Sequence, residues 1–276
     1  MTPVTSGVQT TEEVPRSGGA PPAADDVLRV DGVTKRFDAS GGPLTAVDDV
    51  SLRIRRGEVV TLVGPSGCGK TTLLKMMVGL VKPDDGAIHL RGERVTGIPH
   101  NIGFVFQDPA LLPWKTVHRN VELALDAKKM SSAEKRAAVD RYLALTGLAD
   151  FAKFPPYQLS GGMQRRVALA RGLVGSPDVL MLDEPFVALD ALTRSALQQE
   201  LATIIEDTGT TSVFVTHDVD ESVFLSDRVL VMTARPGRIQ EVVTVPLQRP
   251  RVLKDVRVDP LANELRNHIH ELIEHS

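Results

Sequence analysis

Apolar and polar positions along the chain change their spacing several times, and these changes divide it into segments. Residues 1 to about 25 are rich in Thr, Ser, Gly, Pro and Ala and hold almost no large apolar side chains. Such a segment cannot bury enough surface to offset the entropy of ordering, so we expect a disordered arm over residues 1–26. From residue 27 to residue 54 apolar and polar positions alternate around a glycine turn at 40–43, which predicts an antiparallel sheet.

Short apolar runs in the rest of the chain are typical of buried strands. They cover residues 58–63, 101–107, 179–183 and 212–216. Helical spacing follows the first run and recurs over residues 117–151, where Ser131 and Glu134 have capping-box spacing. A hairpin is predicted around residues 228–239, and an amphipathic helix from about Pro260. The pattern therefore predicts an α/β core with an inserted helical region.

Composition narrows the class of protein. The chain has 276 residues, 42% of them hydrophobic and 24% charged, which fits one large or two small globular units. A net charge of -3 provides no generally basic surface, so we expect no nucleic-acid partner. We also expect no membrane span, because no apolar run reaches roughly 18 residues, and no secretory signal. Cys68 is the single cysteine, which excludes an internal disulfide and is compatible with a reducing cytoplasm.

The strongest chemical signal follows the first buried run. Residues 64–72 read GPSGCGKTT and satisfy G-x-x-x-x-G-K-[ST] between a predicted strand and a predicted helix. The glycines allow a tight turn whose NH groups face a polyphosphate, and the helix start attracts the same anion. We expect Lys70 to reach the outer phosphates and the Thr71 hydroxyl to bind Mg²⁺. The expected nucleotide-binding residues of this loop are Gly64, Pro65, Ser66, Gly67, Cys68, Gly69, Lys70, Thr71 and Thr72.

Polar side chains at the ends of the other buried strands are further candidates. Gln107 ends one strand, where its amide oxygen can complete a Mg²⁺ shell or position water. Asp183 and Glu184 end the next, where they can hold Mg²⁺ and orient or deprotonate an attacking water. His217 follows the strand at 212–216 and can hydrogen-bond a terminal phosphate. Each also has a structural interpretation, as a loop cap, a strand-end turn or a structural histidine.

Four other features have two interpretations each. Ser160 and the two glycines after it form either a second anion site at a helix start or an ordinary N-cap. Phe37 either offers an aromatic face to a nucleotide base or belongs to the core. Cys68 is either a small filler of the loop or a redox-active thiol at a helix start. The apolar loop around Trp114 is either local packing or a docking surface for a partner.

The order of these motifs resembles the ATP-binding cassette ATPases over about residues 27–239, and L-S-G-G-x-Q at 159–164 distinguishes that family from other P-loop proteins. The resemblance implies these roles: Phe37 stacks on the base, Gln107 is the Q-loop glutamine, Asp183 the Walker B aspartate, Glu184 the catalytic glutamate, Asp190 the D-loop aspartate and His217 the switch histidine, while Ser160, Gly161, Gly162 and Gln164 form the signature. The implied catalytic residues are Lys70, Gln107, Glu184 and His217, and the implied Mg²⁺ ligands Thr71, Gln107 and Asp183.

The resemblance also implies a fold and an assembly. It implies a P-loop NTPase (RecA-like) core over residues 27–245, with an N-terminal antiparallel β subdomain and a helical subdomain inserted at about 108–176. Residues 246–276 would form a C-terminal extension with an amphipathic helix. The family works as a head-to-tail homodimer in which the P-loop of one copy and the Ser160 helix start of the other hold the same ATP. This arrangement explains why one chain carries two anion sites.

Segments at 105–114, 155–164, 184–194 and 216–239 are similar to importer ATPases of the nitrate, sulfonate, taurine and bicarbonate group. This similarity implies ATP hydrolysis with Mg²⁺, a separate transmembrane permease, a solute-binding protein acting through it, and a peripheral location at the cytoplasmic face of the plasma (inner) membrane. Two residues depart from that group: Val187 stands where Gly is usual, and Arg165 where Gln is common. A β-branched Val187 is expected to stiffen the link between the two sites of the dimer.

Two rival functions stay open. A soluble ATPase of the same family in translation or DNA repair usually has two cassettes or a long coiled-coil insertion. Only about fifty residues separate Gln107 from Ser160 here, without a sustained heptad repeat. The other rival is a nucleotide-binding regulator without turnover. The sequence does not indicate the solute, because the permease and a binding protein recognise it.

Overall fold

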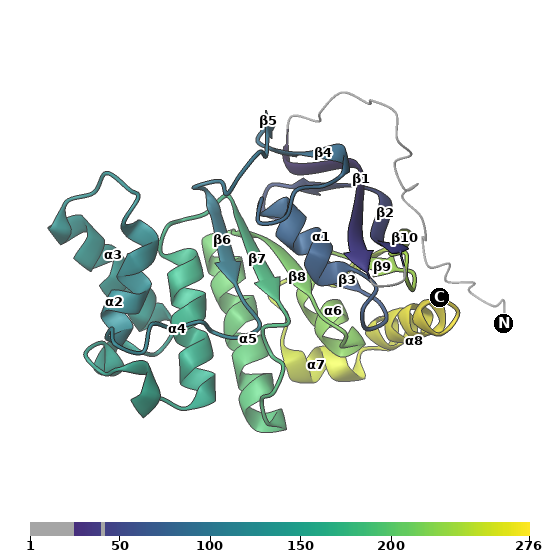
Figure 1. Cartoon of the computed structure of the whole chain (residues 1–276). Helices are drawn as coiled ribbons and strands as arrows, with labels where there is room; N and C mark the ends of the chain where they lie inside the picture. The colour runs from purple at the N-terminus through teal and green to yellow at the C-terminus, as the bar shows by residue number, and fades with distance from the viewer. Residues whose placement is uncertain (1–24, 40–41) are drawn as a thin grey trace.

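The computed structural model describes residues 25–39 and 42–276. The predicted disordered arm therefore lies almost entirely outside the described residues, as does half of the turn at 40–43. The described chain forms two sheets, with helices packed around the larger one (Figure 1).

The smaller sheet is antiparallel, as the alternating pattern predicts, and has the strand order β2-β1-β4-β5. Its strands are β1 (Asp26–Ala39), β2 (Gly42–Arg55), β4 (Asp85–Leu90) and β5 (Glu93–Arg94). β4 and β5 follow the predicted phosphate loop in the chain, so the smaller sheet combines strands from both sides of that loop.

The larger sheet has the order β10-β9-β3-β8-β7-β6, and all neighbours pair in parallel except β10, which runs antiparallel to β9. Its strands are β3 (Val59–Val63), β6 (Ile102–Val105), β7 (Val179–Asp183), β8 (Thr211–Val215), β9 (Arg228–Met232) and β10 (Ile239–Thr244). β3, β7 and β8 are buried at every position, as the apolar runs predict. β6 is shorter than expected, because Phe106 and Gln107 leave this edge strand and are exposed.

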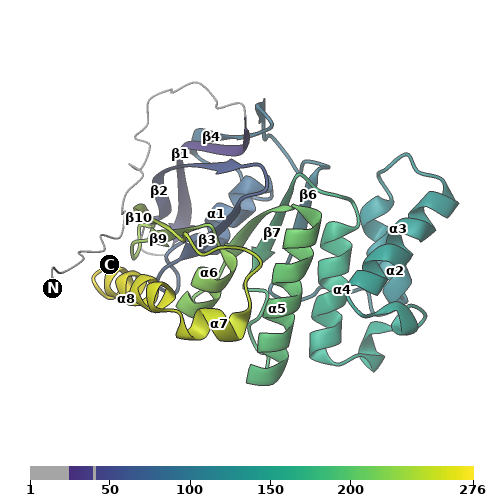
Figure 2. The same cartoon turned by 180° about the vertical axis from the view of Figure 1, so that it is seen from behind.

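Helices cover both faces of the larger sheet (Figures 1 and 2). They are α1 (Lys70–Met77), α2 (Val117–Glu122), α3 (Ser132–Leu145), α4 (Gly161–Leu173), α5 (Ala191–Thr208), α6 (Val219–Leu225), α7 (Leu253–Val258) and α8 (Pro260–Glu274), with short 3-10 turns at Leu123–Leu125, Ala149–Phe151 and Pro156–Gln158. Alternate residues of β3 serve two cores. Val60 and Leu62 pack with α1 and the smaller sheet, whereas Val59 and Val63 pack with α4, α5 and α6.

The helical region between β6 and β7 is confirmed as α2, α3 and α4; α4 packs against the sheet beside β6, and α2 and α3 lie beyond it at the edge of the molecule (Figure 1). The predicted capping box is present: the Ser131 hydroxyl accepts from the backbone N–H of Glu134, whose carboxylate accepts from the Ser131 N–H at 2.7 Å. The predicted hairpin is β9 and β10, and the predicted closing helix is α8, which buries Leu265 and Ile269. None of the described helices is both long and apolar enough to cross a bilayer.

Candidate functional site

The loop between β3 and α1 has the backbone that a phosphate loop requires. Gly64, Gly67 and Gly69 all have positive φ angles, of 153°, 77° and 104°. A Cβ on Gly69 would lie 2.5 Å from the Ala46 carbonyl oxygen, so β2 packs on the loop too closely for a side chain. Gly69 is the N-cap residue of α1, and it has no side chain that could accept from the first N–H groups of the helix. The first N–H groups of α1 are therefore available to an anion.

Lys70 and Cys68 are both buried within this loop. The Lys70 ammonium donates to the carbonyl oxygens of Gly64 at 2.7 Å and Pro65 at 3.0 Å. It therefore lies against the start of the loop in which phosphates would bind. Cys68 is 1% exposed. A redox-active thiol needs access to solvent, so this burial favours the interpretation of Cys68 as a small filler.

Five of the predicted residues meet at the carboxyl edge of the larger sheet. The Thr71 hydroxyl donates to Asp183 Oδ1 at 2.9 Å. Gln107 Nε2 donates to Glu184 Oε2 at 3.2 Å, and His217 Nδ1 lies 3.6 Å from Glu184 Oε1. They come together because β3, β6, β7 and β8 are parallel and end at the same edge.

Thr71 and Asp183 fit a magnesium ion. Octahedral Mg²⁺ binds oxygen at about 2.0–2.1 Å, which places neighbouring ligands about 2.9 Å apart. The Thr71 and Asp183 oxygens are separated by 2.9 Å. Burial is the main cause that raises the pKa of Asp183, against the hydrogen bond from Thr71. A carboxylate that is costly to bury uncompensated is suited to a cation.

Glu184 is held by its backbone. Its φ angle of 45° lies in the left-handed region, which is uncommon for a residue with a side chain. Its N–H donates to the carbonyl oxygen of Val215 at 2.9 Å, which fixes it beside the end of β8 and the following His217. This strained turn directs the carboxylate toward Gln107 and His217.

The signature residues lie at the start of α4. Ser160 is exposed and caps the helix, accepting from the Met163 N–H at 3.3 Å. Gln164 donates to the carbonyl oxygens of Pro156 at 3.0 Å and Leu159 at 3.3 Å, so its amide binds the preceding turn of its own chain. Its role in nucleotide binding stays a prediction. α1 and α4 pack on opposite faces of the larger sheet, so the two predicted anion sites are separate within one chain.

Asp190, Phe37 and Trp114 are all exposed. Asp190 caps α5, and the hydrogen bonds it accepts, chiefly from Thr193, lower its pKa. Phe37 is 41% exposed, so it does not belong to the core, and the Lys35 ammonium lies over its ring, 5.4 Å from the ring centre. Trp114 is 76% exposed, which excludes the interpretation as local packing.

The sequence did not indicate that the hairpin turn contacts the phosphate loop. Arg235 Nη2 donates to the Gly67 carbonyl oxygen at 2.9 Å. A Cβ on Gly237 would lie 1.9 Å from the Cys68 carbonyl oxygen, so glycine is required at this approach. The hairpin is visible in the pattern, but its position depends on β9 pairing with β3, more than 160 residues earlier.

The chain is similar to known proteins in both sequence and structure. The ABC transporter family model matches residues 47–187. The chain is 47% identical over 224 residues to an uncharacterized ABC transporter ATP-binding protein of Methanocaldococcus jannaschii, covering 81% of this chain and 84% of that protein. It is 43% identical over 250 residues to the bicarbonate transport ATP-binding protein CmpD of Synechococcus elongatus, covering 90% of each.

Solved structures give the same result for the fold. A bacterial ABC transporter cassette in its dimeric form is similar with a TM-score of 0.71 and 32% identity, over 80% of this chain and 100% of that one. The same cassette in a post-hydrolysis state binds ADP and Pi. CbiO1 from Clostridium perfringens, part of an ABC transporter complex, has a TM-score of 0.71 and 30% identity over 91% of this chain and 98% of that chain. The predicted fold class is confirmed, and the chain belongs to the ABC transporter family as one of its ATP-binding, ATP-hydrolysing subunits.

Proposed function

We propose that this chain is the ATPase subunit of an ABC importer that takes up a small anion such as nitrate, bicarbonate, a sulfonate or taurine. The observation that carries the proposal is the cluster of Gln107, Glu184 and His217 beside the Thr71–Asp183 pair at the mouth of the phosphate loop. The similarity to CmpD, named for bicarbonate transport, supports the anion class. It also supports the importer over a soluble ABC ATPase of translation or DNA repair.

In this proposal the phosphate loop and the start of α1 bind the phosphates of ATP, and Lys70 moves from the loop carbonyls to the outer phosphates. Glu184 orients and deprotonates the attacking water, with Gln107 and His217 on either side of it. Thr71, Gln107 and Asp183 would hold Mg²⁺, which would supply positive charge beside the phosphates. The chain's contribution is thus mainly positioning and fixed charge.

The separation of Ser160 from the phosphate loop supports a head-to-tail dimer, because two copies are needed to bring both to one ATP. In it, Ser160, Gly161, Gly162 and Gln164 of one copy and Phe37 and residues 64–72 of the other surround the nucleotide, with Asp190 beside them. The dimeric form of the similar cassette supports this arrangement.

A separate permease docks at the exposed surface beside Gln107 and Trp114, so the chain is peripheral at the cytoplasmic face of the inner membrane. A solute-binding protein acts through that permease. We assign residues 27–245 to the ATPase domain, about 108–176 to its helical subdomain and 246–276 to a C-terminal extension.

Steady-state ATPase assays of Lys70→Ala and Glu184→Gln test the catalytic assignment. We expect kcat to fall at least about 100-fold in Glu184→Gln, since it loses the base, and ATP affinity to fall in Lys70→Ala. Glu184→Gln should also accumulate an ATP-bound dimer, measured by light scattering. Glu93→Gln, an exposed carboxyl on β5, is the matched control and should behave like the wild type. Wild-type rates in either site variant would refute the assignment.

Two outcomes would favour the rivals. Copurification with ribosomes in place of a permease would favour a role in translation. ATP binding with negligible hydrolysis, even with the permease present, would favour a regulator.

A further inference from the structure

Arg165, in the second turn of α4, binds three backbone carbonyl groups from two loops. Its Nη1 donates to the carbonyl oxygens of Gln107 at 3.2 Å and Pro185 at 2.9 Å, and its Nη2 donates to that of Val187. Gln107 belongs to the loop after β6, whereas Pro185 and Val187 belong to the loop between β7 and α5. One side chain therefore joins α4 to both loops.

This guanidinium is arranged to hold backbone. Within the described residues Arg165 forms no ion pair, and burial of the half-buried side chain is the main cause that lowers its pKa. The fork geometry of arginine allows several acceptors to be bound in fixed directions at once. The hydrogen bonds that Arg165 donates within the described residues all go to carbonyl oxygens.

The three carbonyl groups lie next to the reacting groups. Gln107 supplies one itself, and its Nε2 donates to the Glu184 carboxylate. Pro185 directly follows Glu184, whose left-handed backbone needs support to persist. Val187, one of the two departures from the importer pattern, is the third. The two departures thus contact each other.

A second arginine on the same helix makes a loss of Arg165 tolerable for the fold. Arg171 donates to the carbonyl oxygens of Ala110 at 2.9 Å and Pro109 at 2.6 Å, so the loop after β6 has another anchor. No equivalent arginine holds Pro185 within the described residues. Removing Arg165 is therefore expected to release chiefly the Glu184 segment.

We propose that Arg165 is a positioning residue for ATP hydrolysis, which holds Gln107 and Glu184 in one arrangement and ties it to the helix that begins after Ser160. The inference rests on the proposed role of Glu184 as catalytic base. Because Arg165 acts through Glu184, its loss changes the chemical step and leaves the binding of ATP to the phosphate loop unchanged.

Kinetics of Arg165→Met and Arg165→Gln test the proposal, with Arg166→Met as the matched control. Arg166 is the next residue of α4, and its guanidinium pairs with Glu200 at 2.8 Å, away from both loops. We expect Arg165→Met to lower kcat about tenfold or more with KM for ATP within about twofold, since small misplacements cost this much. Arg165→Gln keeps one donor group and should recover part of kcat. Arg166→Met should keep kcat within about twofold.

A double-mutant cycle with Glu184→Gln, followed by single-turnover hydrolysis, separates positioning from a general structural role. We expect Arg165→Met to add less than about twofold to the loss in the Glu184→Gln background, because the residue it positions is gone. Equal losses in both backgrounds, or a wild-type kcat in Arg165→Met, would overturn the inference. If Arg165→Met does not fold, judged by circular dichroism, the cycle is run with Arg165→Gln. Wild-type activity of Glu184→Gln itself would instead overturn the proposed function.

Discussion

At the residue scale, a buried carboxyl group lies next to the strand end that carries His217, the predicted switch histidine. Glu221, in the first turn of α6, is 6% exposed and accepts hydrogen bonds from the Thr216 hydroxyl at 2.6 Å and Gln198 Nε2 at 3.0 Å. Burial is the main cause that raises its pKa to about 7, and the two hydrogen bonds oppose it. Because Thr216 directly precedes His217, this group supports the end of β8 from within.

The raised pKa predicts a pH dependence of stability. The folded state binds a proton on Glu221 up to a pH of about 7, whereas an ordinary Glu releases it near 4.5. The contribution of Glu221 to the free energy of unfolding therefore falls as pH rises between these values and is level above them. Glu221→Gln lacks this loss, so its stability relative to the wild type should rise across the window by up to about 3 kcal/mol.

Urea unfolding of both proteins at pH 5 and pH 8 measures this difference. Glu93→Gln on β5 is the control and should show the same difference from the wild type at both pH values. A Glu221→Gln difference that does not change with pH would contradict the prediction.

Short motifs in the sequence indicated candidate site residues, but not the residues that hold them in place. Lys70 lies in the glycine-rich loop motif, and Asp183 and Glu184 end a predicted strand, so candidate roles could be assigned to them from local pattern and resemblance. Arg165 and Glu221 were not assigned a site role, since their partners come from distant segments: Arg165 binds Gln107, and Glu221 binds Gln198. Such partners are fixed only by the packing of the whole sheet.

At the scale of elements, β6 and α4 approach each other at two glycines. A Cβ on Gly103 would lie 2.2 Å from the carbonyl oxygen of Gly172, and a Cβ on Gly172 would lie 3.1 Å from Val105 Cγ2 at the end of β6. β6 leads to Gln107, and α4 begins after Ser160. The close contact therefore sets the spacing between the loop after β6 and the signature helix.

Gly103→Ala should destabilise the protein by about 1–3 kcal/mol, because the methyl group forces the strand and helix apart. Gly97→Ala is the matched control: its Cβ would meet nothing within 4 Å, and its effect should stay within about 0.5 kcal/mol. The measurement is the free energy of unfolding in urea at neutral pH. Equal effects of the two substitutions would show that the approach at Gly103 is not constrained.

Helices and strands long enough to show a regular spacing of apolar residues were predicted well, whereas short helices and strand ends were predicted poorly. The buried strands and α8 carry enough repeats of a period to be identified. α7 has only six residues, too few for a helical period, and was not predicted. The end of β6 was placed two residues late, because an apolar residue, Phe106, continues the strand pattern although its ring is exposed and packs 4.3 Å from that of Phe104.

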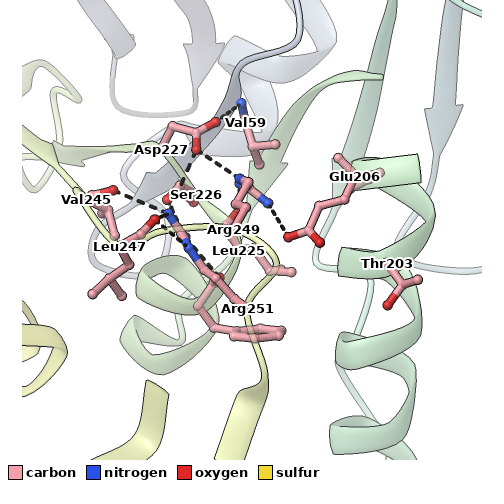
Figure 3. A network of polar contacts seen from close by, with 12 residues as sticks. Val59, Thr203, Glu206, Leu225, Ser226, Asp227, Val245, Leu247, Arg249 and Arg251 are labelled. Atoms are coloured by element: carbon pink, nitrogen blue, oxygen red, sulfur yellow. Dashed lines mark hydrogen bonds and ion pairs between the residues drawn. The ribbon is translucent and has the colours of Figure 1, made fainter. Parts of the chain in front are cut away.

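At the scale of the whole molecule, two arginines join the C-terminal segment to the core (Figure 3). Arg249 pairs with Asp227 and Glu206, each at 3.1 Å, and Asp227 also accepts from the Val59 N–H at the start of β3. Arg251, which is 3% exposed, donates to five carbonyl oxygens. These belong to Val223, Phe224, Ser226, Val245 and Leu247. The segment before α7 and α8 is thus tied to α6 and to the strand that carries the phosphate loop.

Arg251→Met tests whether this connection stabilises the molecule as a unit. Burial is the main cause that lowers the pKa of Arg251, to about 10, so the guanidinium stays charged at neutral pH and its donors remain available. Methionine fills the space but leaves several buried carbonyl groups without a donor, which should lower the free energy of unfolding by about 3 kcal/mol or more. Arg257→Met, which removes only an exposed contact with Ser195, is the control and should change it by less than about 0.5 kcal/mol. Urea unfolding followed by circular dichroism compares the two variants. A loss in Arg251→Met as small as that in the control would mean that the C-terminal segment contributes little to the stability of the ATPase core.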